Sequence, residues 1–90
     1  MTRVLLPTVL RIHSDGHGVV EVDAANVGEA LLALTRKYPD LRGALLDEEG
    51  QLRNYINVFV NDDNIRDRDQ QLTRVDPRDE ILIVPALAGG

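Results

Sequence analysis

The sequence has no cysteine and no tryptophan, and its 90 residues include only one phenylalanine, two tyrosines and one methionine. The absence of cysteine excludes disulfides, thiolate zinc sites and a cysteine nucleophile. Because aromatic residues are so few, the core must be built from Leu, Ile, Val and Ala. A chain of this length is expected to form one domain with a small core and modest stability.

Long apolar runs and an excess of basic residues are also missing. No stretch approaches the ~20 apolar residues needed to cross a bilayer, and the N-terminus lacks the pattern of a signal peptide. We therefore expect a cytoplasmic protein with no membrane partner. The net charge of -5 argues against nucleic acid as a partner, since nucleic-acid binding requires clustered Lys and Arg. It suits a basic protein partner.

The patterns typical of enzymes and metal sites are weak. His13 and His17 flank a glycine-rich turn and have no obvious third ligand. The acidic residues between 62 and 69 lack the central Gly and the final Glu of a calcium-binding loop. There is no glycine-rich phosphate loop and no nucleophile elbow. We therefore predict no catalytic residue, no metal site and no bound cofactor.

Hydrophobic periodicity predicts an α+β domain over residues 1–85. A helix should begin after Asn26, with Glu29 as its capping-box partner, and should end at Pro39. A further helical turn is expected at residues 40–46. Strands are predicted at residues 3–11, 19–22, 55–60, 65–67 and 80–85. This order predicts a mixed sheet of four to five strands, its first and last long strands central, with one main helix packed across it.

Alternation along the last two long strands divides their side chains between two faces. The residues expected to face the helix are Ile56, Val58, Ile81 and Ile83. One helix covers only one face of a small sheet, so Phe59, Leu82 and Val84 are predicted on the opposite face. An exposed apolar cluster with a polar rim commonly marks a partner-binding site. The alternative is that the segment 40–54 folds over this cluster.

The ending Ala-Leu-Ala-Gly-Gly, residues 86–90, follows the last predicted strand and Pro85. We expect it to be a flexible tail. Gly89 and Gly90 have no side chains, so their backbone can pass through a channel too narrow for other residues. The carboxylate of a terminal glycine is also the least hindered acyl group that a protein can present. The alternative is a frayed end with accidental glycines.

Three features combine in this chain: the order of its elements, the strand and turn YINVFVNDDNI, and the ending DEILIVPALAGG. Together they resemble the ubiquitin-like sulfur carriers of the MoaD/ThiS family. The stretches PTVLRIHSDGHGVVEVDAANVGEALLAL and NVFVNDDNIR are similar to the CysO-type carriers of cysteine synthesis in particular. The resemblance covers nearly the whole chain and implies a β-grasp, ubiquitin-like fold.

The resemblance also implies a carrier that has no catalytic residues of its own. An E1-like enzyme would use ATP to adenylate the carboxylate of Gly90, and sulfur would then convert it to a thiocarboxylate for a sulfur-accepting synthase. Gly89 would be the neighbour of Gly90 in a narrow channel, and Phe59, Leu82 and Val84 would meet the activating enzyme. The residues expected to line the partner's groove are Ala86, Leu87 and Ala88.

Several pathways and functions remain open at this point. Cysteine synthesis is the first choice for the sulfur, molybdopterin the second, and thiamine or a specialised metabolite the third. Val84 and Ala86 flank Pro85 where many MoaD proteins have two prolines in a row, which favours the cysteine-type carrier. A protein modifier or ubiquitin-like adaptor joined through Gly90 to a lysine is the main alternative. A plain interaction domain with an inert tail is the other.

Overall fold

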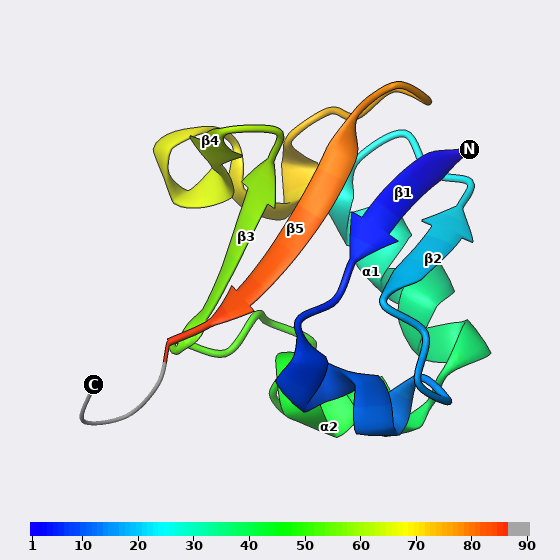
Figure 1. The fold of residues 1–90 in the computed structure, drawn as a ribbon. Coiled ribbons are helices and arrows are strands. Elements are labelled where there is room, and N and C mark those ends of the chain that lie inside the picture. Colours follow the sequence, from blue (N-terminus) through cyan, green and yellow to red (C-terminus); the bar gives the residue numbers. More distant parts are fainter. Residues whose placement is uncertain (87–90) are drawn as a thin grey trace.

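The computed structural model describes residues 1–86, which form a five-stranded mixed sheet with its two α-helices packed on one side (Figure 1). The strands are β1 (Thr2–Leu5), β2 (Val19–Val22), β3 (Ile56–Val60), β4 (Asp63–Asn64) and β5 (Glu80–Pro85). The helices are α1 (Val27–Lys37) and α2 (Asp40–Leu45), with 3-10 helices η1 (Thr8–His13), η2 (Ile65–Asp67) and η3 (Gln70–Leu72). The predicted α+β class is confirmed.

The sheet has the strand order β2-β1-β5-β3-β4, so β5 is its central strand. β1 pairs with β5 in parallel, whereas β2 and β3 run antiparallel to their neighbours. The first and last long strands are therefore both interior, as the sequence predicted. This arrangement of a mixed sheet grasping one main helix is the β-grasp fold.

The main helix begins and ends where the sequence predicted. The Asn26 side chain accepts a hydrogen bond from the Glu29 N–H at 2.8 Å, which satisfies one of the free N–H groups of the first turn. The Glu29 carboxylate accepts from the Ala25 N–H at 2.9 Å, one residue before the cap. α1 ends before Pro39, and α2 then supplies the extra helical turn. Within residues 1–86, no helix is long and apolar enough to cross a membrane.

The hydrophobic core lies between the inner face of the sheet and the helices. Its fully buried members from α1 and the neighbouring α2 are Val27, Ala30, Leu31, Leu34, Leu41 and Leu45. The sheet contributes Val4, Val20, Val22, Ile56, Val58, Val60, Ile81 and Ile83. The alternation predicted for the last two long strands is therefore confirmed, because every second residue of β3 and β5 is buried.

One predicted strand is too long, and another is wrong. The first strand was expected to run through residue 11, but β1 ends at Leu5 and residues 8–13 form η1 after Pro7. This 3-10 helix buries Leu10 in the core. Pro7 has no N–H to donate to a neighbouring strand, so it disfavours a strand that continues past residue 7. Residues 65–67 form η2 in place of a return strand, with Ile65 buried and the Asn64 side chain capping the Arg66 N–H at 2.9 Å.

Candidate functional site

The outer face of the sheet, opposite the helices, carries a row of apolar side chains. Register places Leu5 opposite Val19 on one side and opposite Leu82 on the other, and Leu82 opposite Phe59. We call Val19, Leu5, Leu82 and Phe59 the outer apolar row. Val19 is 43% exposed and Leu82 37%, while Leu5 and Phe59 are half-buried. Val84 lies in the next row of the same face, opposite Asn57, and is also half-buried.

The structure therefore brings the three predicted patch residues together on one face. The segment 40–54 does not cover them, because Leu41 and Leu45 of α2 are fully buried in the core on the other side of the sheet while Leu82 is exposed. The alternative in which this segment folds over the patch is wrong. Leu5 and Val19 were missed. Alternation alone could have put them on the outer face, but only the pairing register shows that they adjoin Leu82.

Polar groups border the outer apolar row on one side. Arg3 lies opposite both Glu21 and Glu80 in the adjacent row, and its Nη1 forms a 2.9 Å ion pair with Glu80 Oε2. Both side chains are about half exposed, so this pair contributes little to stability. Its position gives the apolar row a charged margin, which is typical of protein interaction sites.

Arg66 covers the other margin of this face, along the part of β3 that the short edge strand β4 leaves unpaired. β4 pairs only with the last two residues of β3, so the first part of β3 has an unpaired edge. Arg66 Nη2 donates to the carbonyls of Ile56 at 3.0 Å and Asn54 at 3.2 Å, and Nε donates to Asn57 Oδ1 at 3.4 Å. An edge whose carbonyls are occupied by a charged side chain is protected from pairing with another chain.

The chain leaves the sheet beside β3. Pairing of β3 with β5 continues to Ile56 and Pro85, and the Ala86 N–H then donates to the Tyr55 carbonyl at 2.6 Å. Ala86 is exposed. The other predicted tail residues, Leu87, Ala88, Gly89 and Gly90, lie outside the described residues, so their roles and the domain boundary after residue 85 stay predictions.

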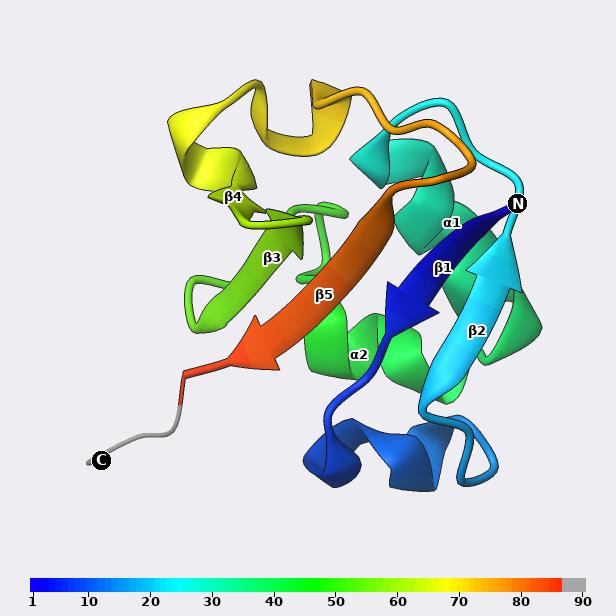
Figure 2. The ribbon, with the colours of Figure 1, turned by 45° about the horizontal axis from the view of Figure 1, so that its top comes forward.

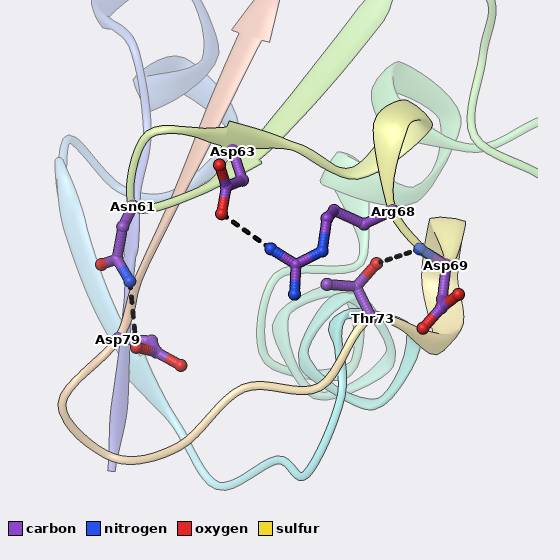
Figure 3. Close-up of polar contacts among 6 residues, drawn as sticks. All are labelled: Asn61, Asp63, Arg68, Asp69, Thr73 and Asp79. Carbon is purple, nitrogen blue, oxygen red and sulfur yellow. Dashed lines mark hydrogen bonds and ion pairs between the residues drawn. The ribbon is translucent and has the colours of Figure 1, made fainter.

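The acidic loop after β3 is stabilised by its own polar contacts (Figure 3). Asp63 Oδ2 forms an ion pair with Arg68 Nη1 at 2.8 Å, and the Asp69 N–H donates to Thr73 Oγ1 at 3.1 Å. In the part of the chain that the structure describes, no three His, Asp or Glu side chains are grouped so that they could hold a metal ion. These contacts favour a structural role for the loop.

A second polar contact closes the turn before β5. Asp79 accepts a hydrogen bond from the Asp76 N–H at 2.9 Å. It accepts another from the Asn61 side chain at 3.0 Å (Figure 3). The hydrogen bond from the Asp76 N–H lowers the pKa of the Asp79 carboxyl below its usual value, and the Asn61 amide adds a smaller effect in the same direction. Asn61 has a φ of 54°, a left-handed conformation that asparagine tolerates better than most residues. This turn fixes the start of the central strand.

Comparison with known proteins identifies the family. A sequence model of the ThiS family matches residues 4–90. The sulfur carrier protein CysO of Mycobacterium tuberculosis is 32% identical over 89 residues, which cover 97% of this chain and 96% of the relative. Small archaeal modifier protein 3 of Haloferax volcanii is 34% identical over 68 residues, 76% of this chain and 73% of the relative.

A solved structure agrees with these matches. The crystal structure of the BexX/CysO complex of Amycolatopsis orientalis contains a chain that superimposes with a TM-score of 0.92, at 34% identity and over 100% of both chains. A relative from Archaeoglobus fulgidus, 36% identical over 80 residues, is likewise named a putative sulfur carrier protein. This chain therefore belongs to the ThiS family, the β-grasp sulfur carriers.

Proposed function

We propose that this protein carries sulfur on the carboxylate of Gly90. The observation that carries the proposal is the ThiS family match, which extends through residue 90 and so includes the Gly-Gly ending. The sulfur carrier protein CysO supports it as a relative over nearly the whole chain. The central position of β5 adds a physical argument, because the tail is then attached to the most strongly held strand of the sheet.

The proposed chemistry has two steps on one carbonyl. In the first, the Gly90 carboxylate attacks the α-phosphate of ATP on an E1-like enzyme, which gives an acyl-adenylate and releases pyrophosphate. In the second, a hydrosulfide equivalent attacks the carbonyl carbon. The C–S bond forms, the C–O bond to AMP breaks, and AMP leaves with loss of one proton. The product is a thiocarboxylate, a soft nucleophile that is ionised at neutral pH as an activated thiolate is.

The chain's own residues serve as anchor and tail in this proposal. The hydrogen bond between the Ala86 N–H and the Tyr55 carbonyl ties the base of the tail to β3. Ala86, Leu87 and Ala88 would line the groove of the enzyme, and Gly89 would let the backbone pass a narrow entrance. Since the chain has no cysteine, the sulfur would not compete with a thiol of the carrier itself.

The outer apolar row is the proposed contact for the activating enzyme. The row contains Phe59 and Leu82, and Val84 lies beside it on the same face; these three positions were predicted from the sequence. The Arg3–Glu80 ion pair borders this face. Burial of such a cluster against a partner would supply the main favourable term for binding. A sulfur-accepting synthase would be the second partner.

Cysteine synthesis is the proposed destination of the sulfur, followed by molybdopterin and then by thiamine or a specialised metabolite. The CysO relatives support cysteine as the first choice. The residues around Pro85 support it too, because Val84 and Ala86 replace the double proline of many MoaD proteins.

Intact mass of the protein isolated from its own cells tests the carrier function. We expect a fraction with the mass gain of one oxygen replaced by sulfur, and fragmentation should map this gain to Gly90. The same protein incubated with the E1-like enzyme and ATP without a sulfur donor should accumulate only the adenylate. Unmodified protein under both conditions would contradict the proposal.

A protein modifier is the second candidate, because a relative is named small archaeal modifier protein 3. In that case a lysine amine would attack the adenylated Gly90 carbonyl, form an isopeptide bond and release AMP. Arg78 is the last basic residue of the chain. Trypsin would therefore leave residues 79–90 as a branch on the target lysine. Mass spectrometry of a tryptic digest that finds this branch would favour the modifier, and its absence alongside a thiocarboxylate would favour the carrier.

A further inference from the structure

The 3-10 helix η1 exposes two apolar side chains that the fold does not use. Val9 is 60% exposed and Ile12 82%. They are three residues apart, and because a 3-10 helix has about three residues per turn they lie on the same side of η1. Leu10, between them, is buried and anchors the helix in the core. The apolar pair Val9 and Ile12 therefore faces away from the core on an anchored element.

The loop that carries η1 is held firmly at its base. The Leu6 N–H donates to the Gly18 carbonyl at 2.8 Å, so the two ends of the loop are joined. Arg11 Nε donates to the Leu6 carbonyl at 3.1 Å, and its guanidinium lies over Gly18, where a Cβ would come within 2.6 Å of Arg11 Cζ. Val9 and Ile12 thus lie on a closed loop, in which the missing side chain of Gly18 leaves space for the Arg11 guanidinium.

Parallel pairing places η1 at the end of the sheet from which the tail leaves. β1 and β5 are adjacent and parallel, so the segment that follows β1 and the segment that follows β5 emerge at the same end. Figures 1 and 2 both show η1 below the end of β1, at the end of the sheet to which β5 points. The loop starts after Leu5 and returns at Val19, two members of the outer apolar row. The loop that carries η1 is therefore connected at both ends to the outer apolar row, while η1 itself contacts α2.

The short tail limits where an enzyme can bind. Four residues follow Ala86, and whatever their conformation they span at most about 14 Å. The protein itself measures 31 × 27 × 25 Å. An active site that holds Gly90 must therefore lie within about half the length of the carrier from Ala86, so the enzyme must approach this end closely.

The low charge of the η1 loop favours an apolar contact there over an electrostatic one. Residues 6–18 contain one acidic residue and one arginine, whereas residues 61–80, at the opposite end of β5, contain seven acidic residues and four arginines. The loop of η1 is thus close to neutral, although Asp47, Glu48 and Glu49 lie in the loop before β3, whose first residue pairs with Pro85. An enzyme that meets η1 would gain most from burying Val9 and Ile12.

We propose that η1 is a second docking element for the activating enzyme, with Val9 and Ile12 packed against an apolar surface beside the entrance that admits the tail. This inference rests on the proposed function. The outer apolar row and η1 would then form one continuous contact that wraps the end of the sheet and orients the tail toward the adenylation site.

The test measures ATP-dependent adenylation by the E1-like enzyme of the same organism as the concentration of carrier is varied. For Ile12→Asp we expect the KM for the carrier to rise about tenfold or more with kcat within about twofold, since a buried apolar contact is replaced by a charge. Val9→Asp should act in the same direction. The matched control is Leu72→Asp, whose side chain is 73% exposed on η3, away from the tail, and whose KM should stay within about twofold.

Both target side chains are exposed, so each variant should unfold at nearly the same temperature as the unsubstituted protein. Thermal unfolding of each variant checks this and separates a lost contact from a lost fold. An unchanged KM for Ile12→Asp, or an equal rise for Leu72→Asp, would overturn the inference. Normal adenylation with impaired sulfur transfer to the synthase would also overturn it, since the contact would then belong to the other enzyme. If the unsubstituted protein is not adenylated at all, the proposed function itself fails.

Discussion

Single side chains determine where several backbone segments begin and turn. Asn26 caps α1, Arg66 occupies the carbonyls at the free edge of β3, and Asp79 closes the turn that leads into β5. Each of these side chains bonds to backbone groups that lack a partner in regular secondary structure. Asn and Asp have short side chains that favour caps and turns, so the roles of Asn26 and Asp79 follow from a local sequence pattern. The position of Arg66 was not predicted, because it depends on the path of η2.

Stability should depend on the ionisation of Asp79. Its folded-state pKa is lowered by the Asp76 N–H and the Asn61 amide, so its contribution is present above the unfolded-state pKa and is lost as pH falls through the lowered one. Asp79→Asn should therefore destabilise the protein at about pH 7, and the difference from the unsubstituted protein should shrink toward about pH 3. Urea unfolding at both pH values measures this. Glu48→Gln, in an exposed loop, is the control and should show a smaller change; a difference for Asp79→Asn that does not vary with pH would contradict the prediction.

The Asn26 cap should be worth about 1 kcal/mol. Asn26→Ala leaves the Glu29 N–H without its 2.8 Å acceptor, so the free energy of unfolding should fall by about that amount. Asn26→Asp keeps an acceptor oxygen at the same place and should restore most of it. Equal losses in the two variants would show that the hydrogen bond is not the cause.

Among the elements, β5 connects the core to the candidate site. Its inner residues Ile81 and Ile83 are fully buried, its outer residue Leu82 joins the apolar row, and its end leads to Ala86. The sequence predicted both faces of β5 and β3, because alternation is a local pattern. It did not predict that Leu5 and Val19 complete the row, since register between strands that are distant in the chain depends on tertiary packing.

Leu82→Asp should weaken binding of the activating enzyme without unfolding the protein. The side chain is 37% exposed at the centre of the outer apolar row, and a charge there would oppose burial against a partner. We expect the KM for the carrier in adenylation to rise about tenfold. Leu32→Asp provides a matched control, because Leu32 is 43% exposed but lies on α1, on the other side of the sheet. Similar effects of the two variants would argue against a specific site on the outer face.

The protein as a whole carries different charge densities on the segment 61–80 and on the η1 loop, residues 6–18. Antiparallel β3 and β5 place the acidic segment 61–80 at one end of the sheet, and parallel β1 and β5 place η1 and the tail at the other. The η1 loop, with one acidic residue and one arginine, is therefore close to neutral. The rise in KM caused by Ile12→Asp should therefore persist at high ionic strength, since the contact that η1 makes is apolar.

Removal of Gly90 should abolish adenylation and leave stability unchanged. The residue lies outside the described part of the structure, and the core members that the structure describes run from Val4 to Ile83. We expect equal unfolding temperatures for the full chain and the chain that lacks Gly90, but no AMP transfer to the shortened one. Adenylation of the shortened chain would show that the reactive carboxylate need not be that of Gly90.

Local patterns in the sequence were enough to establish the α+β class, the caps of α1, the two faces of β3 and β5, and the resemblance to the sulfur carriers. These features depend on residues close in the chain or on short motifs. The tertiary structure decided the rest. Burial of Leu10 and Ile65 turned two predicted strand segments into 3-10 helices, strand register assembled the outer apolar row, and parallel pairing of β1 with β5 brought η1 to the end where the tail emerges. Each of these depends on contacts between segments far apart in the chain, which no local pattern encodes.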